Sequence, residues 1–127
     1  MKYEDRPDFL RRWSKGGFTL YLFETGKRKS TGQEILRYVF KDRDKTIFEG
    51  ADFGASPMFG IDSDAAVYAL LGFLSVGEHD TDADYFASYT PAQIAWRDSS
   101  RREELAMLVY EFDQHLTKFE RKEGFPW

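Results

Sequence analysis

The acidic segment from Glu78 to Asp84 holds the residue types best suited to chemistry. It reads Glu78-His79-Asp80-Thr81-Asp82-Ala83-Asp84. Aspartates at alternate positions also begin calcium-binding loops, because calcium is held by several carboxylate oxygens. The match then ends, since the sixth position of such a loop is Tyr85 rather than Gly and the twelfth is Pro91 rather than Glu. We therefore predict no metal site. We interpret the segment instead as a solvated loop whose carboxylates stabilise the N-terminus of the next helix. The alternative is a loop that binds a partner.

The two histidines give little support for catalysis. His79 lies beside carboxylates, an arrangement that suits a general base. However, the chain has no Cys, and Ser75 lacks the first glycine of a nucleophile elbow. His115 flanks an apolar stripe, and we interpret it as a boundary residue that pairs with Glu111. We predict no catalytic residue.

Two further loops have the composition of ligand-binding segments. Residues 54–60 are bounded by glycines, but they have neither the lysine nor the glycine triplet of a phosphate-binding loop. The basic turn Lys27-Arg28-Lys29 could meet phosphates, and nearby strand aromatics could stack on bases, namely Tyr21, Phe23, Tyr38 and Phe40. The glycine-aromatic signature of sheet-based RNA modules is absent, and the chain is acidic overall. We therefore expect neither nucleic acid as a partner nor a cofactor.

The charges are segregated along the chain. The net charge is −4, yet residues 46–96 contain no Lys or Arg. Such segregation bears on partners rather than on fold. The hypothesis that follows is that acids of this region share one exposed side and bind a protein with a basic surface. The candidate partner-binding residues are Asp62, Asp64, Glu78, Asp80, Asp82 and Asp84.

Length and composition predict one domain over residues 1–127, because a chain of this size can bury an ordinary core. The 12 Phe, 7 Tyr and 3 Trp make that core easy to build. The absence of Cys fits a reducing compartment. No apolar run approaches the roughly 18 residues of a membrane span, and the polar N-terminus is unlike a signal peptide. We expect a cytoplasmic protein; the oligomeric state stays open.

The first half of the chain predicts strands. Residues 1–17 read as an N-terminal arm or short helix that Gly16-Gly17 ends. Residues 18–53 then read as three strands with short turns, from Phe18 to Thr25, from Gln33 to Lys41 and from Thr46 to Phe53. Three consecutive strands of this kind favour an antiparallel β-meander.

The second half predicts helices. Residues 62–122 change to helical spacing, with Val67, Leu70, Leu71 and Leu74 on one face. Further helix starts are Thr81, Thr90-Pro91 and Ser100, and the last helix would carry Leu105, Leu108, Val109, Phe112, Leu116 and Phe119. Residues 106–112 could alternatively form a fourth strand. Residues 123–127 would be a tail. The predicted fold class is α+β, a three-stranded antiparallel β-meander followed by packed helices.

The central third of the chain carries a compact signature. It consists of Phe48-Glu49-Gly50, Ser56-Pro57, Ile61-Asp62-Ser63-Asp64, Leu70-Leu71, Asp80 to Phe86 and Tyr89-Thr90-Pro91. This stretch resembles small uncharacterised bacterial proteins of the kind carried on plasmids and phages. The resemblance implies a mobile-element origin but brings no activity and no functional residue.

Two classes of function compete on these observations. The first is a non-enzymatic protein-interaction module, such as an inhibitor that docks an acidic face on a basic or nucleic-acid-binding partner. The second is a small hydrolase or metal-dependent enzyme that uses the Glu78–Asp84 loop. We favour the first, because no nucleophile, ligand spacing or cofactor loop supports the second.

Overall fold

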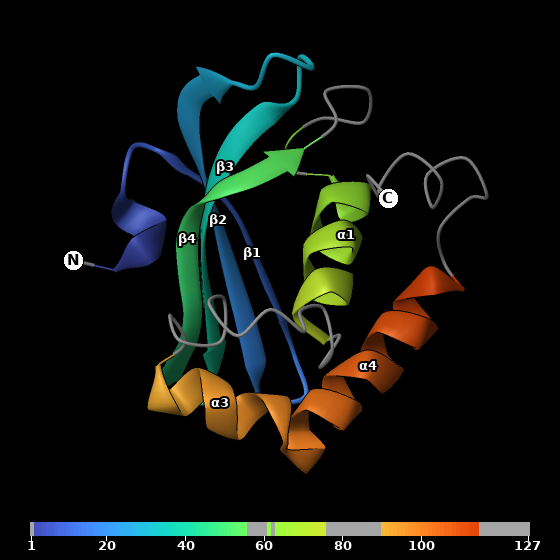
Figure 1. Cartoon of the computed structure of the whole chain (residues 1–127). Coiled ribbons are helices and arrows are strands. Elements are labelled where there is room, and N and C mark those ends of the chain that lie inside the picture. Colours follow the sequence, from blue (N-terminus) through green and yellow to red (C-terminus); the bar gives the residue numbers. More distant parts are fainter. Residues whose placement is uncertain (1, 56–60, 62, 76–89, 115–127) are drawn as a thin grey trace.

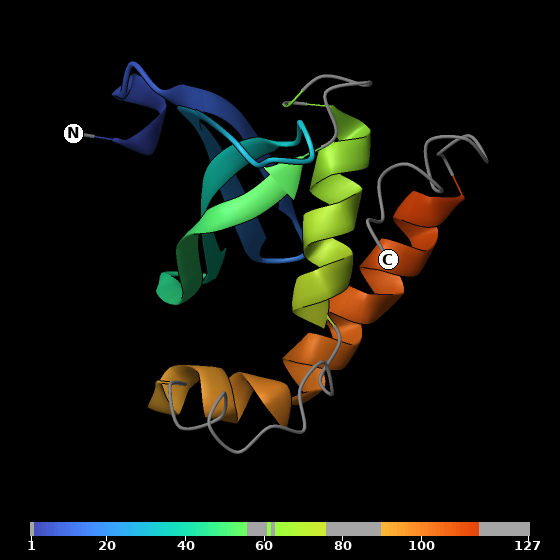
Figure 2. The ribbon, with the colours of Figure 1, turned by 45° about the horizontal axis from the view of Figure 1, so that its top comes forward.

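The computed structural model describes residues 2–55, 61, 63–75 and 90–114. Its elements are, in chain order, η1 Tyr3–Asp5, β1 Phe9–Lys15, β2 Phe18–Arg28, β3 Glu34–Asp42, β4 Lys45–Ala55, α1 Asp64–Ser75, α3 Pro91–Arg97 and α4 Ser100–Asp113. The strands form one antiparallel sheet in the order β1-β2-β3-β4. Figure 2 shows α1 between the sheet and α4, while Figure 1 shows α3 across one end of the strands and η1 on the opposite face. The α+β class is confirmed.

The sheet has four strands, so the prediction of a three-stranded meander is wrong in this detail. The segment 1–17, predicted as an arm or short helix, contains strand β1, which pairs with β2. Gly16 and Gly17 do not end a helix but form the two-residue turn of this hairpin, with φ of 62° and 88°. Positive φ at both positions is what a type I′ hairpin turn requires, and glycine adopts it without strain. The adjacent charges of Arg11 and Arg12 interrupt the apolar pattern by which a strand is predicted, although charged residues are common on edge strands.

Apolar side chains on the front face of the sheet pack against the helices. From the sheet come Phe18, Leu20, Leu22, Leu36, Phe40 and Ile47, and from the helices come Val67, Leu70, Leu71, Leu74, Trp96 and Leu105. The predicted buried face of α1 is therefore confirmed at all four positions. No helix within the described residues is long and apolar enough to cross a membrane.

We expect Leu70→Ala to lower the free energy of unfolding by about 2–5 kcal/mol, because Leu70 is fully buried and its truncation leaves a cavity. Urea unfolding followed by circular dichroism would measure the change. Met107→Ala is a suitable control, since Met107 is exposed on α4 and its truncation should change stability by less than about 0.5 kcal/mol. Equal midpoints for both variants and the parent chain would contradict this packing.

The back face of the sheet has a smaller cluster of its own. Phe23 is completely buried there, and among the described residues the three-residue helix η1 and neighbouring side chains cover it. The rings of Tyr3 and Phe9 contact it, and the Arg6 guanidinium lies 4.8 Å from its centroid. Two hydrogen bonds hold Arg6 to Asp8, and they lower the pKa of that carboxyl. This cluster packs the N-terminal segment, predicted as an arm or short helix, against the back of the sheet.

The start of α3 follows the predicted capping box. The Thr90 hydroxyl accepts a hydrogen bond from the Gln93 backbone, the Gln93 side chain accepts one from the Thr90 backbone, and Pro91 occupies the first turn. Gln93 also donates to the Ile47 carbonyl at 3.1 Å, which attaches α3 to β4. The predicted helix start at Thr81 lies outside the described residues.

Residues 106–112 belong to the last described helix, α4, and do not form the fourth strand considered as an alternative. Its N-cap is Ser99, one residue before the predicted start at Ser100. Leu105 is buried, and Leu108, Val109 and Phe112 pack against the core. The predicted continuation through Leu116 and Phe119 lies outside the described residues.

Candidate functional site

Of the six predicted partner-binding residues, only Asp64 lies in the described part of the chain. Its side chain is 58% exposed at the start of α1, and it forms an ion pair of 2.7 Å with Arg11 of β1. The other five lie outside the described residues, namely Asp62, Glu78, Asp80, Asp82 and Asp84. His79 and His115 lie outside them as well. The hypothesis of one shared acidic side therefore stays a prediction.

The remaining described acids of residues 46–96 are Glu49 and Asp52, both exposed on β4. Glu49 pairs in register with Val39, whose side chain faces away from the front core, so Glu49 lies on the back of the sheet. Asp64, in contrast, belongs to the helical layer in front. These described acids thus do not form one continuous face.

A different acidic surface lies on α4 and was missed in the sequence analysis. Met107 and Tyr110 are 68% and 69% exposed, which is unusual for such large apolar side chains. The carboxylates of Glu103, Glu104 and Glu111 are exposed on the same helix. Spacings of three, four and seven residues place all five on one side of a helix. We call these five residues the α4 outer face. Their positions off the Leu105–Leu108–Phe112 stripe were the signal available in the sequence.

Strong contacts on the inner side hold α4 in place. Arg101 donates to the carboxylate of Asp42 and to the Gly16 carbonyl, and its guanidinium lies 4.1 Å from the Phe18 ring centroid. The hydrogen bonds that Arg101 donates to the Asp42 carboxylate raise the pKa of Arg101. Arg102 donates to the carbonyls of Ser75 and Arg97, at the ends of α1 and α3, where a cation complements the helix dipole. The outer face is therefore presented on a fixed helix.

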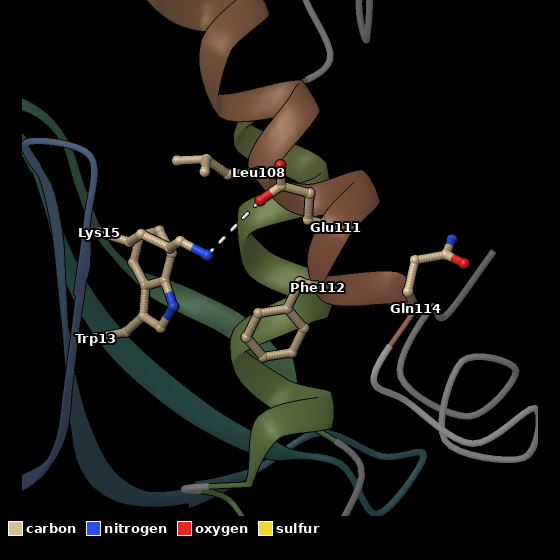
Figure 3. A pocket seen from close by; sticks show the side chains of 6 residues that line it. All are labelled: Trp13, Lys15, Leu108, Glu111, Phe112 and Gln114. Atoms are coloured by element: carbon tan, nitrogen blue, oxygen red, sulfur yellow. Dashed lines mark ion pairs between the residues drawn. The ribbon is translucent and has the colours of Figure 1, made fainter.

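A hollow of about 440 Å³ opens between β1 and α4, beside the α4 outer face. Its lining residues are Trp13, Lys15, Leu108, Glu111, Phe112 and Gln114. Figure 3 shows the rings of Trp13 and Phe112 on either side of the hollow, with Lys15 directed at Glu111. The Lys15 ammonium lies 3.6 Å from the Glu111 carboxylate, and both side chains are more than half exposed. The walls are mainly apolar, while one ion pair crosses the rim.

The described residues do not assemble a reactive centre. No group of three or more His, Asp and Glu side chains within them could hold a metal ion. The pKa shifts of Asp8, Asp98 and Arg101 all come from ion pairs at positions away from the hollow: Arg6 lowers the first, Arg97 lowers the second and Asp42 raises the third.

The rings considered for base stacking are not presented as a platform. Phe23 and Phe40 are fully buried, on opposite faces of the sheet. In the basic turn, Arg28 pairs with Glu34 at 3.2 Å, and a small hollow of about 160 Å³ lies along this hairpin. The arrangement lacks the exposed aromatic row that single-stranded nucleic acid needs among these four residues.

Comparison with protein-family models, with curated proteins and with solved structures found no match to this chain. Among the described residues, the α4 outer face and the adjoining hollow combine exposed apolar groups with charge of one dominant sign.

Proposed function

We propose that this chain is a non-enzymatic protein-interaction module that docks an acidic, partly apolar surface on a basic partner. The observation that carries the proposal is the α4 outer face, where exposed Met107 and Tyr110 lie among three carboxylates. Aromatic and Met side chains are enriched in protein interfaces, and exposed apolar patches rimmed by polar residues mark interaction sites. The acid-rich, Lys- and Arg-free stretch 46–96 adds negative charge to the same molecule.

Electrostatics favours a partner with a basic surface. Among the residues around the α4 outer face, Lys15 already faces Glu111, and Arg101 is held by Asp42 and Glu104. Glu103 has no ion pair within the described residues, so the surface retains negative charge. Complementary charge speeds encounter and suppresses wrong partners, and its effect weakens with salt. Nucleic-acid-binding proteins are one class with such basic surfaces. Docking on that surface would prevent them from binding nucleic acid.

The experiment compares two triple variants that remove the same charge. The first, Glu103→Gln with Glu104→Gln and Glu111→Gln, neutralises the α4 outer face. The second, Glu24→Gln with Glu49→Gln and Asp52→Asn, neutralises exposed acids on β2 and β4. The probe is a fluorescein-labelled, Lys-rich 16-residue peptide, titrated at low and moderate salt. We expect the first variant to bind about tenfold more weakly at low salt, since each exposed pair contributes about 0.2–1 kcal/mol.

The matched variant should bind the peptide like the parent chain, because only its distant charges differ. Equal weakening by both variants would mean that the peptide senses net charge rather than the α4 outer face. A third variant, Asp80→Asn with Asp82→Asn and Asp84→Asn, tests the acidic residues 78–84 in the same titration. An unchanged affinity and salt slope for that variant would reject these residues as a contact.

A further inference from the structure

We propose that the hollow between β1 and α4 is the anchor site of this interaction surface. It would receive one large apolar side chain from a Lys- or Arg-rich segment of the partner. The inference rests on the proposed function and names the kind of segment recognised. A few well-packed anchors dominate the energy of most protein interfaces, and they seat in pockets surrounded by weaker polar contacts.

The lining of the hollow matches an apolar anchor. Trp13 of β1 and Phe112 of α4 supply aromatic walls, and Leu108 supplies an aliphatic one. Phe112 is held from behind by stacking on Tyr68, with ring centroids 5.9 Å apart and planes 16° apart. Tyr68 in turn donates to Asp113 at 2.7 Å. The far wall is thus fixed before any ligand arrives, which keeps the ordering that binding requires small.

The rim of the hollow can bind a cationic side chain that lies next to the apolar anchor in the partner. Glu111 faces Lys15 across 3.6 Å, and with side chains 58% and 59% exposed the pair holds the rim only weakly. A Lys or Arg of the partner can therefore replace Lys15 as the ion-pair partner of Glu111. The apolar residue next to it in the partner then enters between the rings of Trp13 and Phe112. Glu104 and Glu103 continue the acidic edge about two turns before Glu111 along α4. A basic segment with a single large apolar residue fits both features at once.

The position of the hollow, rather than its volume, favours a polypeptide over a free small molecule. At about 440 Å³ it is at the lower end of the range of small-molecule sites, about 300–1,000 Å³. It is also continuous through Glu111 with the exposed Met107 and Tyr110, which a small molecule in the hollow would leave uncovered. A segment lying along α4 would cover all three.

The test uses two Lys-rich, 16-residue helical peptides that differ at one central position, Phe in one and Ala in the other. We expect the Phe peptide to bind the parent chain about tenfold more tightly, as burial of one aromatic side chain implies. Trp13→Ala should abolish this preference. Tyr3→Ala removes a half-buried ring from the back of the sheet and should leave the preference intact.

A gain of affinity gives the second readout. Lys15→Gln removes the cation that competes for Glu111, so it should tighten binding of the Phe peptide about threefold at low salt. Lys27→Gln makes the same change of net charge on the distant β2–β3 hairpin and should have a smaller effect. In ¹H–¹⁵N spectra, the Trp13 indole signal, assigned by its loss in Trp13→Phe, should shift on addition of the Phe peptide.

The outcomes separate the two proposals. If both peptides bind equally and the Glu103, Glu104 and Glu111 variant still weakens them, the surface docks basic partners but the anchor site is wrong. If neither peptide binds the parent chain, the proposed function fails and the anchor site with it. If the chain instead self-associates and Trp13→Ala abolishes that association, the occupant is a second copy, and the inference is overturned.

Discussion

Trp96→Ala should lower the free energy of unfolding by about 3–5 kcal/mol, because it truncates a large buried side chain. Trp96 lies edge-on to the rings of Phe18 and Phe40, with centroids 5.7 and 5.5 Å away. Its indole also donates to the Leu74 carbonyl at the end of α1, at 3.2 Å. One side chain therefore joins α3, the sheet and α1, and its loss opens a cavity among all three.

Trp96→Phe separates the two contributions of this residue. It keeps an aromatic ring against Phe18 but removes the donor to Leu74, so we expect a smaller loss of about 1–2 kcal/mol. Urea unfolding should be followed by circular dichroism, because both variants remove a fluorophore. A loss below about 1 kcal/mol for Trp96→Ala would mean that α3 does not belong to the core.

Arg101→Met should lower the free energy of unfolding by about 2–3 kcal/mol. The side chains of Arg101 and Asp42 are only 22% and 16% exposed, so removal of the guanidinium leaves a largely buried carboxylate without its partner. The substitution also removes the cation over the Phe18 ring and the donor to the Gly16 carbonyl. Met keeps much of the apolar volume, so the loss reports mainly the polar contacts.

A double-mutant cycle with Asp42→Asn tests this assignment. We expect a coupling of about 1–3 kcal/mol between the two positions, as for residues in direct contact. Arg12→Met is the control, since Arg12 is half exposed and lies 3.6 Å from Glu4, an ion pair that should contribute little. If Arg101→Met proves as mild as Arg12→Met, Arg101 does not hold α4 to the sheet.

Sequence reasoning predicted correctly those elements whose local pattern of apolar and capping residues matches their packing in the fold. The face of α1 with Val67, Leu70, Leu71 and Leu74 is confirmed, and so is the capping box at Thr90. Strand β1 was missed because Gly16-Gly17 stops a helix as readily as it turns a hairpin, and only pairing with β2 distinguishes the two. Ser99 rather than Ser100 caps α4, an ambiguity of one residue that adjacent serines cannot resolve.

The candidate site was less accessible to sequence reasoning than the fold. Residues 46–96 lack Lys and Arg, and this local pattern indicated the acidic residues Glu78 to Asp84 instead of α4. The hollow joins Trp13 and Lys15 to Phe112, nearly a hundred positions later, and no local pattern reports such a pairing. Met107 and Tyr110 could have been noticed as apolar residues off the core stripe, yet their exposure depends on what covers α4.

The order of the sheet has a consequence for folding kinetics. Each strand pairs with its neighbour in the sequence, so the sheet can form from hairpins that close short loops. The bonds of Arg101, by contrast, close loops of 59 residues to Asp42 and 85 residues to Gly16. Closing a long loop costs more conformational entropy than closing a short one, so we expect α4 to dock after the sheet has formed and to exchange its amide hydrogens faster than the sheet. A partner bound to both α4 and β1 would hold α4 against the sheet. Its binding would therefore slow the detachment of α4, which we expect to be the first step of unfolding.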